Sequence, residues 1–97
     1  MSMNKLWSVF TDDMDSCIYT GSPLVERHHI FGASNRKRSE KYGFVVPLRY
    51  DLHPNGASAS QAGSLLDIKL KQKAQEYYEQ HYGTREDFIK EFGKNYL

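Results

Sequence analysis

The stretch VERHHIFGASNRKRSEKYG, residues 25–43, holds two of the four histidines of this 97-residue chain and a dense cluster of basic residues. The β-branched and apolar residues at its start predict a strand from Leu24 to about Phe31. Its second half, NRKRSEKY, predicts a short helix that Ser34 caps and that Gly43 ends in a left-handed conformation. The stretch therefore predicts a strand that is followed closely by a helix.

The segments on either side of this stretch predict further short strands. FVVPLRY, residues 44–50, predicts the return strand of a hairpin-like unit, and Pro47 places that strand at an edge or a bulge of the sheet. LWSVF at residues 6–10 alternates apolar and small polar residues, which predicts a strand that ends at the acidic turn TDDMD. That turn lacks the glycine and distal glutamate of an EF-hand loop, so we interpret it as solvated. CIYTGSP at residues 17–23 predicts another short extended piece.

The carboxyl-terminal part predicts two helices. SLLDIKLKQKAQEYYEQHY, residues 64–82, carries apolar residues at helical spacing, and Gly83 ends the pattern. Thr84 and Asp87 form an approximate capping box for a second helix over residues 85–92. The expected apolar face of the first helix consists of Leu66, Leu70, Ala74, Tyr77, Tyr78 and His81.

Together these elements predict one α+β domain over residues 1–97, with a small antiparallel sheet, a compact loop-rich centre and two packed helices. A chain of this length buries only about 60–65% of its unfolded surface, so the aromatic residues are expected to supply much of the core. Cys17 is the single cysteine, which excludes an intramolecular disulfide. No run resembles a signal peptide or a bilayer-spanning segment, so we expect a cytoplasmic protein without a membrane partner.

The charges are distributed unevenly, although the formal net charge of the chain is only +1. Residues 1–25 carry one lysine and three aspartates, whereas residues 26–50 carry six basic and two acidic side chains. Residues 51–97 carry six basic and seven acidic side chains. The middle third is therefore the basic part of the molecule, which favours contact with a polyanion.

The histidine doublet is the candidate chemical centre. A neutral imidazole can take a proton from water near neutral pH and can also bind a metal ion. Consecutive strand residues point to opposite faces, so His28 and His29 serve one site only if the backbone bends there, for example at Gly32. His53 follows the second strand and would be brought back towards His28. We interpret His81, which lies within the amphipathic helix, as structural.

The ordered set of motifs resembles the HNH endonucleases, the ββα-metal nucleases. HHIFG is followed by a basic segment, by a strand that ends VPL, and by a histidine at the start of the next element. CIYTG, ERHHIFGASNRKRSEKYG, VPL with DLH, and YGTREDFIKEFGKNYL are similar to small HNH-type proteins encoded by phages and prophages of Gram-positive bacteria. The similarity covers the chain from about Cys17 to Leu97.

This resemblance implies a ββα-metal core over about residues 24–60. It implies that His28 and His53 bind a divalent metal and that His29 is the general base that activates water for attack on phosphorus. Mg²⁺ or Mn²⁺ is the expected ion, and Zn²⁺ or Ni²⁺ would also suit imidazole ligands. No small-molecule cofactor is expected.

Some family features are missing from the sequence. The second strand, GFVVPL at residues 43–48, lacks the expected central asparagine, and residues 54–63 lack the further histidine that many relatives carry. Asp51 or Asn55 is a candidate third ligand. The absence of cysteine pairs argues against a structural zinc knuckle.

Basic side chains near the histidines are the expected DNA contacts, because lysine and arginine neutralise adjacent phosphates. Arg27 and Arg49 flank the expected site and either hold the scissile phosphate or pair with Glu26 or Glu40. The residues expected to bind nucleic acid are Arg36, Lys37, Arg38, Lys41 and Arg49.

The sequence thus predicts a metal-dependent DNA endonuclease or nickase. The missing asparagine and histidine leave a second hypothesis, a DNA-binding or phage-assembly accessory protein that keeps the HNH scaffold without turnover. A third is a protein-interaction domain that uses an exposed aromatic helix surface over Tyr77–Tyr82.

Overall fold

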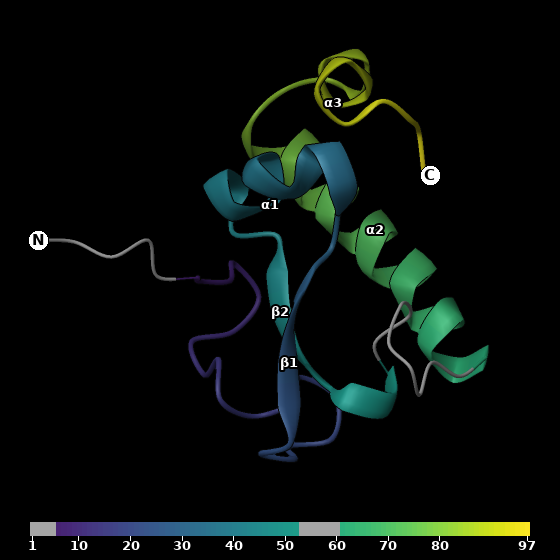
Figure 1. Ribbon diagram of the computed structural model, residues 1–97. Helices are drawn as coiled ribbons and strands as arrows, with labels where there is room; N and C mark the ends of the chain where they lie inside the picture. The colour runs from purple at the N-terminus through teal and green to yellow at the C-terminus, as the bar shows by residue number, and fades with distance from the viewer. Residues whose placement is uncertain (1–5, 53–60) are drawn as a thin grey trace, which may run out of the picture.

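The computed structural model describes residues 6–52 and 61–97 (Figure 1). Within these ranges the protein has the expected α+β composition, with a two-stranded antiparallel sheet and three α-helices. In chain order the elements are β1 (Val25–His29), a 3₁₀ turn (Ala33–Asn35), α1 (Arg36–Tyr42), β2 (Val45–Arg49), a second 3₁₀ turn (Tyr50–Leu52), α2 (Gln61–His81) and α3 (Arg85–Phe92).

The two strands form the expected hairpin-like unit, in which α1 connects β1 to β2. His28 lies opposite Val46 and His29 lies opposite Val45 in the ladder. Pro47 lies opposite Arg27 in a strand that has only one partner strand in the described chain, as expected for a residue without a backbone N–H. Both strands are shorter than predicted, because the chain turns away beyond the ladder at each end.

Helix α1 ends as predicted but starts differently. Gly43 follows it with φ 72°, in the left-handed region that favours glycine. Ser34 is not its cap, because residues 33–35 form a 3₁₀ turn and Asn35 precedes the first α-helical residue. The Asn35 side chain donates to the carbonyl oxygen of Phe92 at 3.0 Å instead of capping α1. Tertiary contact with α3 therefore replaces the local cap.

The predicted strand at residues 6–10 is wrong, because this segment is irregular, and residues 17–23, expected as a short extended piece, also form no strand. Each makes a single backbone bond near the hairpin: the Val9 N–H donates to the carbonyl of Gly43, which ends α1, at 2.9 Å, and the Ile18 N–H donates to the carbonyl of Pro47 in β2 at 3.0 Å. Within the two segments, the Ser8 hydroxyl accepts from the Phe10 N–H at 3.0 Å and the Thr20 hydroxyl accepts from the Ser22 N–H at 3.2 Å. Such local bonds compete with a sheet ladder, which explains why no strand forms.

The predicted carboxyl-terminal helices are confirmed. Helix α2 includes the expected span except Tyr82 and begins three residues earlier than predicted. Thr84 caps α3 in a complete capping box, in which its side chain accepts from the Asp87 N–H and the Asp87 carboxylate accepts from the Thr84 N–H. Gly93 ends α3 with φ 90°.

An aromatic core joins the hairpin to the three helices, with α2 lying along one side of the hairpin (Figure 1). Phe31, which follows β1, packs against Phe44 and against Phe92 of α3. The exposed aromatic surface expected at the end of α2 is present only in part: Tyr82 is half-exposed, but Tyr78 is buried. The buried hydrophobic cluster comprises Ile30, Phe31, Tyr42, Phe44, Val46, Leu48, Leu70, Ala74, Tyr78, Phe88 and Phe92.

No helix within residues 6–52 and 61–97 combines the length and the apolar character needed to cross a lipid bilayer.

Candidate functional site

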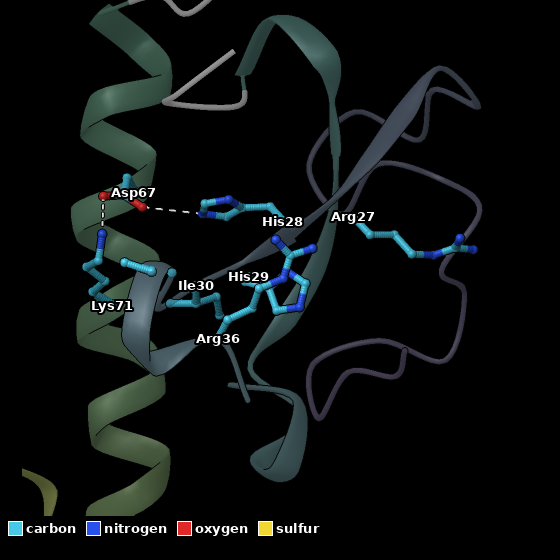
Figure 2. Close-up of a pocket in the computed structure, with 9 residues that line it drawn as sticks. Arg27, His28, His29, Ile30, Arg36, Asp67 and Lys71 are labelled. Atoms are coloured by element: carbon cyan, nitrogen blue, oxygen red, sulfur yellow. Dashed lines mark hydrogen bonds and ion pairs between the residues drawn. The ribbon is translucent and has the colours of Figure 1, made fainter. Parts of the chain in front are cut away.

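The two adjacent histidines of β1 contact different helices. Both are in the ladder with β2, so their side chains leave the strand on opposite faces. His28 is buried and points at α2, where its Nε2 lies 3.3 Å from Oδ1 of Asp67 (Figure 2). His29 points at α1, where its Nε2 lies 2.7 Å from Oε2 of Glu40. Each imidazole therefore faces a carboxylate from a different helix.

Asp67 lies between two nitrogen groups. Its Oδ1 faces His28, and its Oδ2 forms an ion pair with the ammonium group of Lys71, one helical turn further along α2 (Figure 2). Burial raises the pKa of the Asp67 carboxyl, but the neighbouring His28 and Lys71 side chains outweigh burial and hold its pKa below the ordinary value. Asp67 is consequently an anion over the physiological pH range.

The nitrogen–oxygen distance is shorter in the His29–Glu40 pair than in the His28–Asp67 pair. The His29 side chain is only 8% exposed, whereas Glu40 is 36% exposed and remains in contact with water. Glu40 and Arg36 are four residues apart in α1 and therefore share one face of that helix. This face of α1 brings both an anion and a cation to the end of β1.

A pocket of about 270 Å³ opens where β1, α1 and α2 meet. Both histidines of the doublet line it, so the sequence expectation that they serve one site is compatible with their opposite orientations. The bend at Gly32 also contributes to the wall. The complete lining consists of Arg27, His28, His29, Ile30, Gly32, Ala33, Arg36, Asp67 and Lys71.

The expected metal ligands are not gathered within the described residues. His53 and Asn55 lie outside those residues. Asp51 accepts two hydrogen bonds from the Arg49 guanidinium, at 2.6 and 2.9 Å. Residues 6–52 and 61–97 contain no cluster of three or more histidine, cysteine or acidic side chains suited to a metal ion.

The basic residues are spread over several surfaces. Arg36 lines the pocket, whereas Lys37, Arg38 and Lys41 are exposed elsewhere on α1. Arg49 binds Asp51 through the two hydrogen bonds described above.

Arg27 also lines the pocket, and its guanidinium binds Asp15 at 3.0 Å. The alternative that it pairs with Glu40 is therefore wrong, since Glu40 is the partner of His29.

Two functional candidates, Asp67 and Glu40, were not expected from the sequence. Asp67 lies seven and eleven residues before Ala74 and Tyr78, so it continues their inward stripe along α2, and this spacing is a signal that sequence reasoning could have used. Glu40 lies four residues after Arg36, but nothing local identifies His29 as its partner.

Comparisons with protein-family models, with curated proteins and with solved structures find no match to this chain.

Proposed function

We propose that this protein is a metal-dependent DNA endonuclease or nickase whose site is built on the histidine doublet of β1, within an HNH-like ββα core over about residues 24–60. The observation that carries the proposal is the close His29–Glu40 pair, 2.7 Å apart, whose imidazole lines the same pocket as His28 and Asp67. The antiparallel pair β1 and β2 lies within this range and supports the strand part of the assignment.

His29 is the proposed general base. When its Nε2–H donates to Glu40, the neutral ring carries its lone pair on Nδ1. That nitrogen then takes a proton from water as the water oxygen attacks phosphorus. Glu40 fixes the tautomer and stabilises the imidazolium that forms, and such proton transfer typically contributes about 10²–10⁴-fold in rate.

The donor set at His28 suits a divalent cation. A buried imidazole nitrogen faces a carboxylate oxygen, and both atom types bind divalent transition metals. His28, together with His53 as implied by the family resemblance, would hold the ion. A divalent cation there supplies positive charge to the oxygen that leaves phosphorus. Mg²⁺, Mn²⁺, Zn²⁺ and Ni²⁺ are the ions to test.

The substrate side of the proposal rests on the cations around the pocket. Arg36 and Lys71 line its wall, so a phosphate that enters meets positive charge. Lys37, Arg38, Lys41 and Arg49 would contact neighbouring phosphates outside the pocket. Such contacts position a duplex without reading its sequence.

Incubation of the pure protein with supercoiled plasmid, in separate samples with Mg²⁺, Mn²⁺ and Ni²⁺, tests the proposed activity. We expect metal-dependent conversion to the nicked form, reduced by at least about 100-fold in His29→Ala. Glu40→Gln should lower the rate by about tenfold or more with a smaller change in DNA affinity, because Glu40 acts through His29.

The matched control is His81→Ala, which removes an exposed histidine at the far end of α2. It should nick at the wild-type rate. Nicking that survives in His29→Ala, or that the His81 variant loses equally, would contradict the role assigned to His29.

A second candidate function is DNA binding without turnover, as in an accessory protein for phage assembly. Ion pairs within the protein favour binding without turnover, because they occupy side chains that a catalytic site would need. The Asp67 carboxylate already binds Lys71 and faces His28, and Arg49 already binds Asp51. A salt-dependent affinity for duplex DNA, with no nicking in any of the three metals, would establish this alternative.

A further inference from the structure

We propose that the pocket between β1, α1 and α2 binds the phosphomonoester end of a nucleic-acid strand, with Arg36 and Lys71 as its cationic ligands and no metal ion between protein and phosphate. The inference rests on the proposed function for the nature of the ligand, but it requires neither hydrolysis nor a metal. Hydrolysis of a phosphodiester by water leaves one phosphomonoester end and one hydroxyl end. The pocket would therefore hold one of the two ends that the proposed reaction releases.

The charged side chains of the pocket favour an anion. The lining contains three cations and one carboxylate, namely Arg27, Arg36, Lys71 and Asp67. The guanidinium of Arg27 binds Asp15 at 3.0 Å, and Figure 2 shows it pointing away from the two histidines. A ligand in the pocket therefore meets Arg36 and Lys71 as its nearest cations.

Arg36 is the stronger of these two ligands. It is the first residue of α1 and is exposed, and residues 6–52 and 61–97 supply no hydrogen-bond or ion-pair partner to its guanidinium. Figure 2 shows its side chain reaching towards the two histidines. A guanidinium donates to two phosphate oxygens at once. A phosphomonoester offers three terminal oxygens and a charge of about −1.5 to −2 at pH 7, so it binds such a group more strongly than an internal diester does.

Lys71 meets the ligand from the α2 wall of the pocket. Its ammonium group is paired with Asp67 Oδ2, and an ammonium has further N–H donors for a phosphate oxygen. The Asp67 carboxylate opposes the ligand, because its side chain is only 16% exposed and like charges repel strongly where little water screens them. Asp67 therefore lowers the affinity of the pocket for phosphate.

A second hollow continues the pocket. It has a volume of about 700 Å³ and shares three lining residues with the pocket, Arg27, His29 and Arg36. The pocket itself, at about 270 Å³, is smaller than the roughly 300–1,000 Å³ that whole small-molecule ligands occupy, so it suits a phosphate group. Apolar side chains of Leu6, Pro23 and Val25 line the second hollow. The sugar and base next to the terminal phosphate would lie against them.

Fluorescence anisotropy in EDTA, with single strands of about ten nucleotides that carry a dye on an internal base, tests the inference. The strands carry a 5′-phosphate, a 3′-phosphate or two hydroxyl ends. One phosphorylated strand should bind the full chain about tenfold more tightly than the hydroxyl strand, and the two phosphorylated strands show which end fits. Inorganic phosphate should compete for this strand, and a mononucleotide should compete at lower concentration. Equal competition would overturn the place given to the second hollow.

Three variants test the charges. Arg36→Met should reduce the tenfold preference to about twofold or less, and Lys71→Met should also reduce it. Methionine keeps most of the apolar stem, so the change is chiefly one of charge. Asp67→Asn should bind the phosphorylated strand about threefold more tightly or better than wild type. A gain of affinity cannot arise from a folding defect.

The matched controls are Lys69→Met on α2 and Lys90→Met on α3, which are exposed and do not line the pocket. Each should keep the preference within about twofold of wild type. A ratio of two affinities cancels any loss of folded protein. The inference is overturned if wild type binds all three strands equally, if Arg36→Met keeps the full preference, if a control loses it equally, or if Asp67→Asn gains nothing.

Nicking of plasmid separates this inference from the proposed function. The expected preference in EDTA, without nicking in any of the three metals, would uphold the phosphate site and refute the nuclease. Metal-dependent nicking by a protein that binds all three strands equally would do the opposite.

Discussion

Ser39 connects α1 to the chain that leaves β1 through two bonds of one hydroxyl group. Its Oγ accepts from the Phe31 N–H at 3.0 Å and donates to the Phe31 carbonyl at 2.7 Å. Ser39 is fully buried, so water cannot replace either bond. The bend that follows the histidine doublet is thus fixed by one small polar side chain.

Ser39→Ala should lower the free energy of unfolding by about 1–3 kcal/mol, because it leaves a buried N–H and carbonyl without the hydroxyl. Urea unfolding followed by Trp7 fluorescence measures the change. Ser34→Ala is the control, since Ser34 is exposed and does not cap α1. It should stay within about 0.5 kcal/mol of wild type. Equal losses in both variants would contradict the contribution assigned to the two Ser39 bonds.

Gly43 is the junction between α1 and β2, and it serves two needs at once. Its φ of 72° ends the helix, and its missing side chain lets Trp7 pack directly on the backbone. A Cβ built at this position would lie 2.7 Å from the Trp7 ring. The contact of Trp7 with Gly43 therefore holds the amino-terminal segment against the link between α1 and β2.

Gly43→Ala should destabilise the protein more than Gly21→Ala. Both glycines are left-handed, with φ of 72° and 75°, but a Cβ at Gly21 meets nothing within 4 Å. The Gly21 variant should lose about 1–2 kcal/mol from backbone strain alone. The Gly43 variant should lose more and should shift Trp7 emission. Thermal unfolding of both compares them, and equal losses would argue against the Trp7 contact.

The carboxylate of Glu91 connects all three helices of the described chain. Glu91 on α3 accepts from the hydroxyls of Tyr42 on α1 and Tyr78 on α2, each at 2.6 Å. Burial and the neighbouring Glu91 raise the pKa of Tyr42 to about 12 and also raise that of Tyr78. Burial tends to raise the pKa of Glu91, but the two donated bonds outweigh it and lower that pKa.

These shifts predict that stability falls at both ends of the pH range. The folded tyrosines keep their protons when unfolded ones release them, so the free energy of unfolding should fall as pH rises from about 10 towards 12. The folded Glu91 stays ionised longer than the unfolded one, so its contribution is present above about pH 4.3 and is lost as pH falls through its lower folded pKa.

Glu91→Gln should cost about 1–2 kcal/mol at pH 7, because bonds to a neutral acceptor are weaker. The variant should also lose less free energy of unfolding than wild type as pH falls below about 4.3 and as pH rises above about 10. Urea unfolding from pH 3 to 11 measures this, with the exposed Glu76→Gln as control. An unchanged acid dependence in the Glu91 variant would refute its place at the centre of the helices.

Local interactions made a large part of the fold predictable from the sequence. The hairpin-like unit, the end of α1 at Gly43 and both carboxyl-terminal helices depend on side-chain periodicity and on caps within a few residues. The strand at residues 6–10 was predicted wrongly for the same local reason, because a bond within the segment, from the Phe10 N–H to the Ser8 hydroxyl, competes with the alternation that favours a ladder.

The sequence by itself determined the α+β class, the ends of α1 and α3 at Gly43 and Gly93, and the presence of two imidazoles at the end of a strand. Only the tertiary structure decided that His28 meets Asp67 and that His29 meets Glu40. Helical and strand periods fix which face a side chain occupies, but they do not fix which distant face it meets. That choice is made by the packing of the whole aromatic core, which places α2 beside His28 and α1 beside His29.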